Sequence, residues 1–505
     1  MHAYTSEIGP DFEGMKSTDS ERAPMMVSAQ CNSLPSADFI LLCDLHHISL
    51  AISYGTPGDI PMAIIDDDFV MIEKEGLGGP DSGNDYLGSI SSHVEGLSSD
   101  LRSISLDIHD HPELQYKEYH AHHVLTGYLK KQHGWNVTTS AYGIETAFVA
   151  VYDTGKKGPV VSFNAEYDAL AGIGHACGHN LIAIVSLAGA LASAQVLQQA
   201  NYGGRVVLFG TPAEEGGGGK IKLLKAGAYE DVDISLITHP GITPDAALVR
   251  TAAYSTFKVE YFGKEAHAAA RPWDGINALD ALITAYNAIS VLRQQTQPGD
   301  IIQCTFTTGA LSSHQADARA AQIINGGLRP NIIHAYSSGR FVVRSTLKTR
   351  LEALKKRVVA CFEAGATATG ATLKLTAGMG YENHMPNHAL GRSYRHFFNR
   401  LGGNIPIGEL DIINAATQAS TDQGNISHAM PSISCNIWIR SEDKEGQQCG
   451  GPHTPDFEKA ARTAESHELA MRAAKALAGV AVDVCRRPEL LHEAKEEFNK
   501  SQRAQ

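Results

Sequence analysis

Short apolar segments alternate with helical segments between residues 146 and 241, and this alternation restricts the fold more than any other feature of the chain. Strands that alternate with helices form a mostly parallel sheet with helices on both faces. In such sheets, ligands bind beyond the carboxyl ends of the strands. We therefore predict an α/β fold, with strands at 146–152, 160–164, 205–210 and 234–239 and helices at 179–198 and 220–227.

Side chains that can bind a metal follow several of these strands. Cys177 and His179 flank a glycine just before a helix, and a thiolate beside an imidazole suits zinc, cobalt or manganese. By itself, a Cys-x-His pair more often marks a buried thiol and a hydrogen-bonded histidine. A metal site is favoured because further candidates accompany this pair. They lie at or just past the strand ends: Asp168, Glu214, Glu215 and His239.

Glu214 and Glu215 are adjacent carboxylates shortly after an apolar strand. Two buried carboxylates repel each other and lose hydration, so they need a cation between them or a proton on one of them. A solvated loop pair is the simpler explanation when the pair is considered alone. The flanking glycines, the strand end and the nearby cysteine and histidine favour a metal site.

Length and composition restrict the class of protein. A chain of 505 residues is too long for one ordinary core, so two domains plus extensions are expected. A formal net charge of −13 argues against a nucleic-acid partner, because phosphate binding needs a basic surface. The eight cysteines are irregularly spaced, which favours a reducing compartment. No run of about 18 to 20 apolar residues and no secretory signal is visible, so we expect a cytoplasmic protein without a membrane partner.

The predicted elements divide the chain into several parts. One part is predicted as strand, helix, two strands, helix and strand, which resembles a ferredoxin-like α+β domain. Inserted between two halves of a catalytic domain, it could serve as a lid or a dimerisation surface. The predicted parts are an irregular N-terminal extension at 1–85, the catalytic domain at 86–250 and 382–490, the inserted domain at 251–381 and a C-terminal tail at 491–505.

Four residues outside the first half of the catalytic domain are further candidates. Arg344 ends an otherwise apolar predicted strand, where a guanidinium needs a carboxylate partner that a substrate could supply. His267 follows a turn, where a single histidine is usually structural, and Asn331 lies in the segment Arg329-Pro330-Asn331-Ile332-Ile333. His453 could be a last metal ligand, with a helix cap or a surface position as the alternative.

Other histidines are explained more simply without a metal. His109 and His111 fit a corner between two helices, with hydrogen-bonded imidazoles. The pair His46-His47 is interpreted as incidental, because no third type of ligand clusters near it.

The segment from Glu166 to Leu170 together with His175 to Asn180 resembles a known family. This is the co-catalytic zinc metallopeptidase family of aminoacylase, glutamate carboxypeptidase and auxin-conjugate amidohydrolases, and the resemblance covers roughly residues 90 to 490. The chain is most similar to the amidohydrolase subgroup, in which a cysteine replaces the bridging aspartate. Within that subgroup it resembles dipeptidases that act on β-alanyl-lysine and Xaa-Arg substrates.

The resemblance implies hydrolysis of an amide or peptide bond in a small substrate with a free carboxylate. It implies that two divalent ions (zinc, manganese or cobalt) activate water and that Glu214 is the general acid/base. An N-acyl-amino-acid amidohydrolase and a non-catalytic binding protein on the same fold are the alternatives. The implied ligands are Cys177, His179, Glu215, His239 and His453; Asp168 would orient the site, His267 would stabilise the oxyanion and reach the other subunit of a homodimer, and Asn331 and Arg344 would hold the substrate.

The chain departs from the family pattern at three places. Ala171 stands where the subgroup usually has proline, which changes the rigidity of that loop. The connection 304–319 is longer than in the family, and it leaves Ala320 where a histidine is expected. The first 85 residues have no counterpart, and an incorrect gene model would explain both of these extra segments.

Overall fold

The computed structural model describes residues 42–44, 47–49, 86–305, 322–325, 329–443 and 445–504. Most of the predicted N-terminal extension lies outside the described residues, and so do His46, Ala320 and most of the predicted connection 304–319. In the N-terminal unit, residues 1–74, the strand β1 (Leu42–Asp44) pairs with β2 (His47–Ser49) in antiparallel register.

A six-stranded sheet forms the centre of the catalytic domain, with the strand order β15-β7-β5-β6-β4-β3. The first four strands are parallel, which confirms the predicted α/β fold. The strand β4 pairs antiparallel with both of its neighbours, β6 and β3. Only residues 140–147 join β3 to β4, and a parallel crossover would need a longer connection. The strands are β3 (Trp135–Thr139), β4 (Phe148–Asp153), β5 (Val160–Ala165), β6 (Arg205–Gly210), β7 (Ile234–Gly241) and β15 (Ser432–Trp438).

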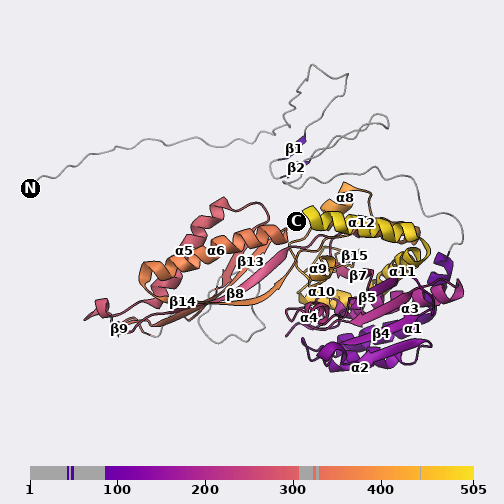
Figure 1. Ribbon diagram of the computed structural model, residues 1–505, viewed down its shortest axis with the longest axis horizontal. Coiled ribbons are helices and arrows are strands. Elements are labelled where there is room, and N and C mark those ends of the chain that lie inside the picture. The colour runs from indigo at the N-terminus through magenta and orange to yellow at the C-terminus, as the bar shows by residue number, and fades with distance from the viewer. Residues whose placement is uncertain are drawn as a thin grey trace, which may run out of the picture. The chain divides into compact units, whose positions relative to one another are not determined.

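Helices cover both faces of this sheet, as Figure 1 shows. Successive side chains of a strand point to opposite faces. In β6, Val206 and Leu208 lie in the main core with helices from both ends of the chain, whereas Phe209 packs in a second core that contains Leu223. The helices are α1 (Leu87–Asp110), α2 (Tyr119–Leu129), α3 (His179–Gln199), α4 (Gly219–Lys225), α7 (His388–Arg400), α8 (Glu409–Ala415), α9 (Gln423–Ser427), α10 (Pro455–Ala461) and α11 (Ala464–Arg486).

Helix α3 is buried in the centre of the main core, beside α1 and α11. By length and composition it could cross a membrane, although the sequence pattern had suggested no such segment. In the structure, 94% of its apolar window is buried inside the protein. Its apolar surface therefore packs against other helices and against the sheet.

The inserted domain has its own core and the strand order of a ferredoxin-like fold, β10-β13-β8-β14. If these four strands are numbered along the chain, their order in the sheet is 2-3-1-4. Helices α5 and α6 pack against each other (Figure 1). The sequence pattern did not predict β10, which pairs with β13 as β11 also does. The elements are β8 (Ala253–Phe262), β9 (Ala266–His267), α5 (Ala278–Leu292), β10 (Ile301–Thr305), β11 (Gln322–Asn325), β12 (Ile332–Ile333), β13 (Tyr336–Ser345), α6 (Lys348–Thr369) and β14 (Thr372–Tyr381).

Helix α12 (Pro488–Ala504) covers most of the segment 491–505 that the sequence predicted as a tail. Leu490 and Ala494 lie in the main core. The carboxylate of Glu497 accepts the backbone N–H groups of His388 and Ala389, at 2.7 and 3.1 Å, and so caps α7. The segment is therefore a packed helix, because its apolar residues recur at helical spacing and find partners in the core.

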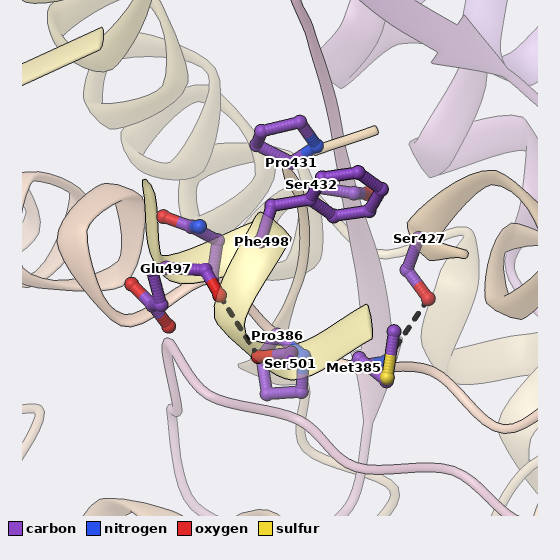
Figure 2. A pocket seen from close by; sticks show the side chains of 9 residues that line it. Met385, Pro386, Ser427, Pro431, Ser432, Glu497, Phe498 and Ser501 are labelled. Atoms are coloured by element: carbon purple, nitrogen blue, oxygen red, sulfur yellow. Dashed lines mark hydrogen bonds between the residues drawn. The ribbon is translucent and has the colours of Figure 1, made fainter. Parts of the chain in front are cut away.

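A small pocket lies where α12 meets the segment before α7, and Figure 2 shows it from close by. Met385 and Ser427 are joined there by a hydrogen bond of 3.0 Å from the backbone N–H of Met385 to Oγ of Ser427. None of the lining residues is a candidate from the sequence.

Candidate active site

The turn between β5 and α3 places Cys177 and His179 at the carboxyl end of the sheet. Gly178 between them has a φ of +75°, a left-handed conformation that glycine adopts without steric cost. A side chain there would also collide with Pro240, since a Cβ atom would lie 2.5 Å from its ring. The glycine therefore lets this turn pack directly against the end of β7, where His239 lies.

Two sets of candidate ligands share the thiol of Cys177. Its Sγ atom lies 3.4 Å from Nε2 of His239, and Nε2 of His453 lies 3.3 Å from Oε1 of Glu215. Within each set the three ligand atoms lie within 4.8 Å of one another. A thiolate common to two sets is the arrangement expected for a bridge between two ions. The sets are Cys177, His179 and His239, and Cys177, Glu215 and His453.

Unpaired buried atoms show that metal ions fit these residues. Nε2 of His179 and Oε1 of Glu215 are buried, and neither has a hydrogen-bond partner in the part of the chain that the structure describes. Such atoms are costly unless a partner or an ion satisfies them. The Nδ1 atoms of His179 and His239 are already held, 3.1 Å from Asp168 Oδ1 and 2.7 Å from the Pro240 carbonyl oxygen. Each ring therefore keeps Nε2 for an ion. The contact of Asp168 with His179 is compatible with the orienting role that the resemblance implies, and that role stays a prediction.

The charges of the site also suit cations. Burial alone would raise the pKa of the Cys177 thiol, but His239 and His179 beside it hold this pKa well below its usual value. Burial and the neighbouring Cys177 raise the pKa of Glu215 to about 7. Buried anionic groups need compensation by nearby positive charge, which two divalent ions would supply.

Glu214 lies beside these ligands but belongs to neither set. Its side chain is buried, and its Oε2 atom lies 3.9 Å from Nε2 of His179. Burial raises the pKa of Glu214 well above its usual value, and the carboxylates of Glu166 and Glu215 raise it further. A carboxyl group with a raised pKa can accept and return a proton near neutral pH. The position suits a general acid/base.

Sequence reasoning missed a buried ion cluster next to Glu214. Nζ of Lys220 lies 2.6 Å from Oε1 of Glu166 and 2.5 Å from Oδ1 of Asp422, and all three side chains are buried. The other carboxylate oxygen of Glu166 lies 3.4 Å from Nε2 of His179. The only signal in the sequence was the position of Glu166 after β5, because the partners are 54 and 202 residues from Lys220.

The loop that carries Glu214 is also held by groups that the sequence did not single out. Ala213 has a φ of +62°, a conformation that costs a non-glycine residue about 1–2 kcal/mol. The backbone N–H of Ala213 donates to the buried carboxylate of Glu118 at 2.9 Å. The N–H of Glu215 donates to Asp168 at 2.9 Å. These bonds compensate for the strain and fix the loop.

His267 and Asn331 lie together, but the structure does not bring them to the ligand cluster. Both are exposed on the inserted domain, where His267 pairs with Ile332 and the Ala268 N–H donates to the Asn331 carbonyl at 3.0 Å. The Nδ1 atom of His267 accepts from the backbone N–H groups of Ala269 and Ala270. Their predicted roles at the site stay predictions.

Arg344 lies at the junction between the inserted and catalytic domains. Its guanidinium donates to Ser420 Oγ at 2.9 Å and to the Gln418 carbonyl at 3.3 Å, and it lies 5.0 Å from the centre of the Tyr254 ring. These partners are neutral. A guanidinium with neutral partners has charge left to pair with an anionic group. The role of Arg344 in holding the substrate stays a prediction.

The corner between α1 and α2 gathers Asp107, His111 and His120 on the surface. Oδ1 of Asp107 lies 3.1 Å from His111 Nδ1 and 3.0 Å from His120 Nε2. Nδ1 of His111 also donates to the Asp107 carbonyl at 2.8 Å, so it carries a proton. His109 is likewise bound, with Nε2 3.0 Å from the Glu458 carbonyl. These contacts agree with the hydrogen-bonded corner that the sequence favoured.

Comparisons with known proteins identify relatives of the chain. Residues 251–369 match the model of the peptidase dimerisation domain. The chain is 37% identical to the human Xaa-Arg dipeptidase over 420 residues, which cover 80% of this chain and 90% of that protein. It is 28% identical to one of the subunits of the Escherichia coli p-aminobenzoyl-glutamate hydrolase over 330 residues, which cover 62% and 65% of the two chains.

A solved structure supports the fold. The structure is that of a dinuclear metal-binding peptidase of the M20 family from Bacillus subtilis, with a TM-score of 0.57 at 19% identity. The match covers 78% of this chain and 99% of that one. Together with the identity to the human enzyme over most of both chains, it confirms the predicted resemblance. The chain belongs to the M20 peptidase family of metal-dependent hydrolases, in the amidohydrolase group that contains the Xaa-Arg dipeptidases.

Proposed function

We propose that this hydrolase cleaves the peptide bond of dipeptides that have a free carboxylate, with a basic C-terminal residue as the preferred group. The observation that carries the proposal is the pair of ligand sets that share Cys177, with Glu214 beside them. The preference for a basic residue is supported by the relative named Xaa-Arg dipeptidase. Arg344, whose guanidinium has neutral partners, is the proposed partner of the substrate carboxylate.

The site residues have separate roles in the proposed peptide hydrolysis. Two ions held by Cys177, His179, Glu215, His239 and His453 would supply activated water and polarise the scissile carbonyl. Glu214 accepts the proton of the attacking water at its carboxylate and then donates it to the leaving amine. Asp168 contacts Nδ1 of His179, the ring nitrogen that does not face the ions, and so holds the imidazole in a fixed orientation.

We propose zinc, manganese or cobalt for the ions, since thiolate, imidazole and carboxylate ligands suit these metals. Elemental analysis of the purified chain, together with reactivation of the chelated protein by each metal, would identify the ion. About two ions per chain are expected. A chain that binds no transition metal and has no hydrolase activity would favour a non-catalytic binding protein.

Substitution Glu214→Gln tests the general acid/base directly. The amide keeps the size of the side chain but cannot take up the proton, so turnover should fall by at least about 100-fold while metal content stays the same. Retained turnover would remove Glu214 from this role. A panel of Xaa-Arg and Xaa-Lys dipeptides against N-acyl amino acids distinguishes a dipeptidase from an aminoacylase-like enzyme.

We also propose a cytoplasmic homodimer that associates through the inserted domain. The match to the dimerisation domain supports the dimer, as do the exposed side chains of Ile283 and Val291, which lie eight residues apart on α5. Apolar side chains exposed along one helix face commonly mark a protein interface. Sedimentation should give a dimer, and Val291→Glu should weaken it; a fully active monomer would contradict the proposal.

A further inference from the structure

Tyr381 bridges the loop of the general acid/base. Its hydroxyl donates a hydrogen bond of 2.5 Å to the backbone carbonyl of Glu214 and accepts the N–H of Gly218 at 3.2 Å. The side chain is only 4% exposed. Within the loop, the N–H groups of Gly216 and Gly217 also donate to the carbonyls of Glu214 and Ala213, at 2.7 and 3.0 Å. The buried hydroxyl adds two bonds to the turn from outside the loop.

Tyr381 is the last residue of the inserted domain. It ends β14, where it pairs in register with Tyr254 near the start of β8. These two strands are the points at which the chain leaves and enters the inserted domain. The two rings meet edge to face, with centres 5.0 Å apart. The guanidinium of Arg344 lies 5.0 Å from the centre of the Tyr254 ring.

These contacts form a continuous connection from Arg344 through Tyr254 and Tyr381 to the backbone of Glu214. The connection crosses between the two domains at their junction. Elsewhere in the loop, backbone N–H groups are held by Glu118 and Asp168, which both belong to the catalytic domain. The Glu214 carbonyl accepts one hydrogen bond from the Gly216 N–H of its own loop and a second from Tyr381, which is contributed by the inserted domain.

We propose that Tyr381 is a positioning residue that fixes the carboxylate of Glu214 by holding its backbone carbonyl from the inserted domain. This inference rests on the proposed role of Glu214 as general acid/base. Without the hydroxyl, the carbonyl loses a buried partner and the turn can rotate, so the carboxylate moves relative to the ligands. A displacement of about 1 Å at a reacting group can lower turnover about 100-fold.

The test compares Tyr381→Phe with a matched control, Tyr261→Phe, in the full-length metal-loaded enzyme. Tyr261 is also a buried tyrosine whose hydroxyl donates to a backbone carbonyl, that of Phe362 at 2.7 Å, but it lies in the core of the inserted domain. Metal content, Tm, kcat, KM and the pH profile of kcat are measured for both variants and for Glu214→Gln. The substrate is the dipeptide on which the wild-type enzyme turns over fastest.

A positioning role predicts that Tyr381→Phe lowers kcat about 10- to 100-fold, with KM within about threefold of wild type and metal content unchanged. The loss should appear in kcat and not in substrate binding, whereas Tyr261→Phe should change only Tm. Equal kcat values for Tyr381→Phe and Tyr261→Phe would overturn the positioning role of Tyr381. If Glu214→Gln is inactive in the same experiment, the proposed function still stands. An active Glu214→Gln enzyme would overturn both.

Discussion

Replacing Lys220 by methionine should destabilise the protein strongly, because the ammonium lies between two buried carboxylates. Its Nζ atom contacts Glu166 at 2.6 Å and Asp422 at 2.5 Å, and its side chain is fully buried. Burial alone would lower the pKa of Lys220, but Asp422 and Glu166 raise it above its ordinary value, so the amine is charged. Methionine fills a similar volume and removes only the charge and the donors.

The size of the effect follows from the charges left behind. Removing one partner of a buried ion pair costs about 3–5 kcal/mol, because the other charge stays buried without compensation. Here one ammonium compensates two carboxylates, so we expect the upper part of that range. The free energy of unfolding of natural domains is about 5–15 kcal/mol. Lys220→Met should therefore lose a large share of the stability of the catalytic domain.

Urea denaturation, followed by circular dichroism, measures this loss. Lys225→Met is the matched control, because Lys225 lies on the same helix but is exposed and should change stability by no more than about 0.5 kcal/mol. Adding Glu166→Gln and Asp422→Asn to Lys220→Met should restore at least half of the loss, since no buried charge then lacks a partner. If Lys220→Met and Lys225→Met were equally stable, the reasoning about buried charge would be wrong.

Three further predictions concern the ligands, the substrate and acid stability. Cys177→Ser should lose bound metal, since a serine hydroxyl stays protonated, whereas Cys449→Ser should retain it; elemental analysis after dialysis checks both. Arg344→Lys should raise KM about 10-fold with little change in kcat, because lysine lacks the paired donors that suit a carboxylate. Steady-state kinetics measures both constants, and an unchanged KM would contradict this role. Burial lowers the pKa of His384 to about 4, so the unfolded chain binds a proton near its usual pKa of 6.5 before the folded one does. Unfolding free energy should fall by up to about 3 kcal/mol more in wild type than in His384→Gln as pH drops from 6.5 to 4, as urea titrations at several pH values would reveal.

The sequence predicted the parallel part of the sheet because each of its strands is a short apolar run followed by a helix or a polar loop. The strands β3 and β10 escaped prediction because each mixes apolar with polar residues over only five positions. The C-terminal helix was missed for a related reason. Its charged residues suggest a solvated tail, and only the contacts of Leu490 and Ala494 show that one face is buried.

One rule about parallel sheets predicted part of the site. Parallel strands end at one edge of the sheet, so Asp168, Glu214 and His239 had to lie near one another. His453 follows no such strand, and the hydrogen bond that brings it to the cluster, from its N–H to the Ala176 carbonyl at 2.8 Å, joins residues 277 positions apart.

Residues that support the site are of a different kind, because their partners lie in other parts of the fold. Lys220 pairs with Asp422 across 202 residues, and Tyr381 reaches Glu214 across 167. A lysine and a tyrosine in such positions carry no local signal, since either would be an ordinary surface residue in another fold. Ligands such as Glu215 and His239 can therefore be found from strand ends, whereas Lys220 and Tyr381 can be assigned only once distant parts of the chain are packed together.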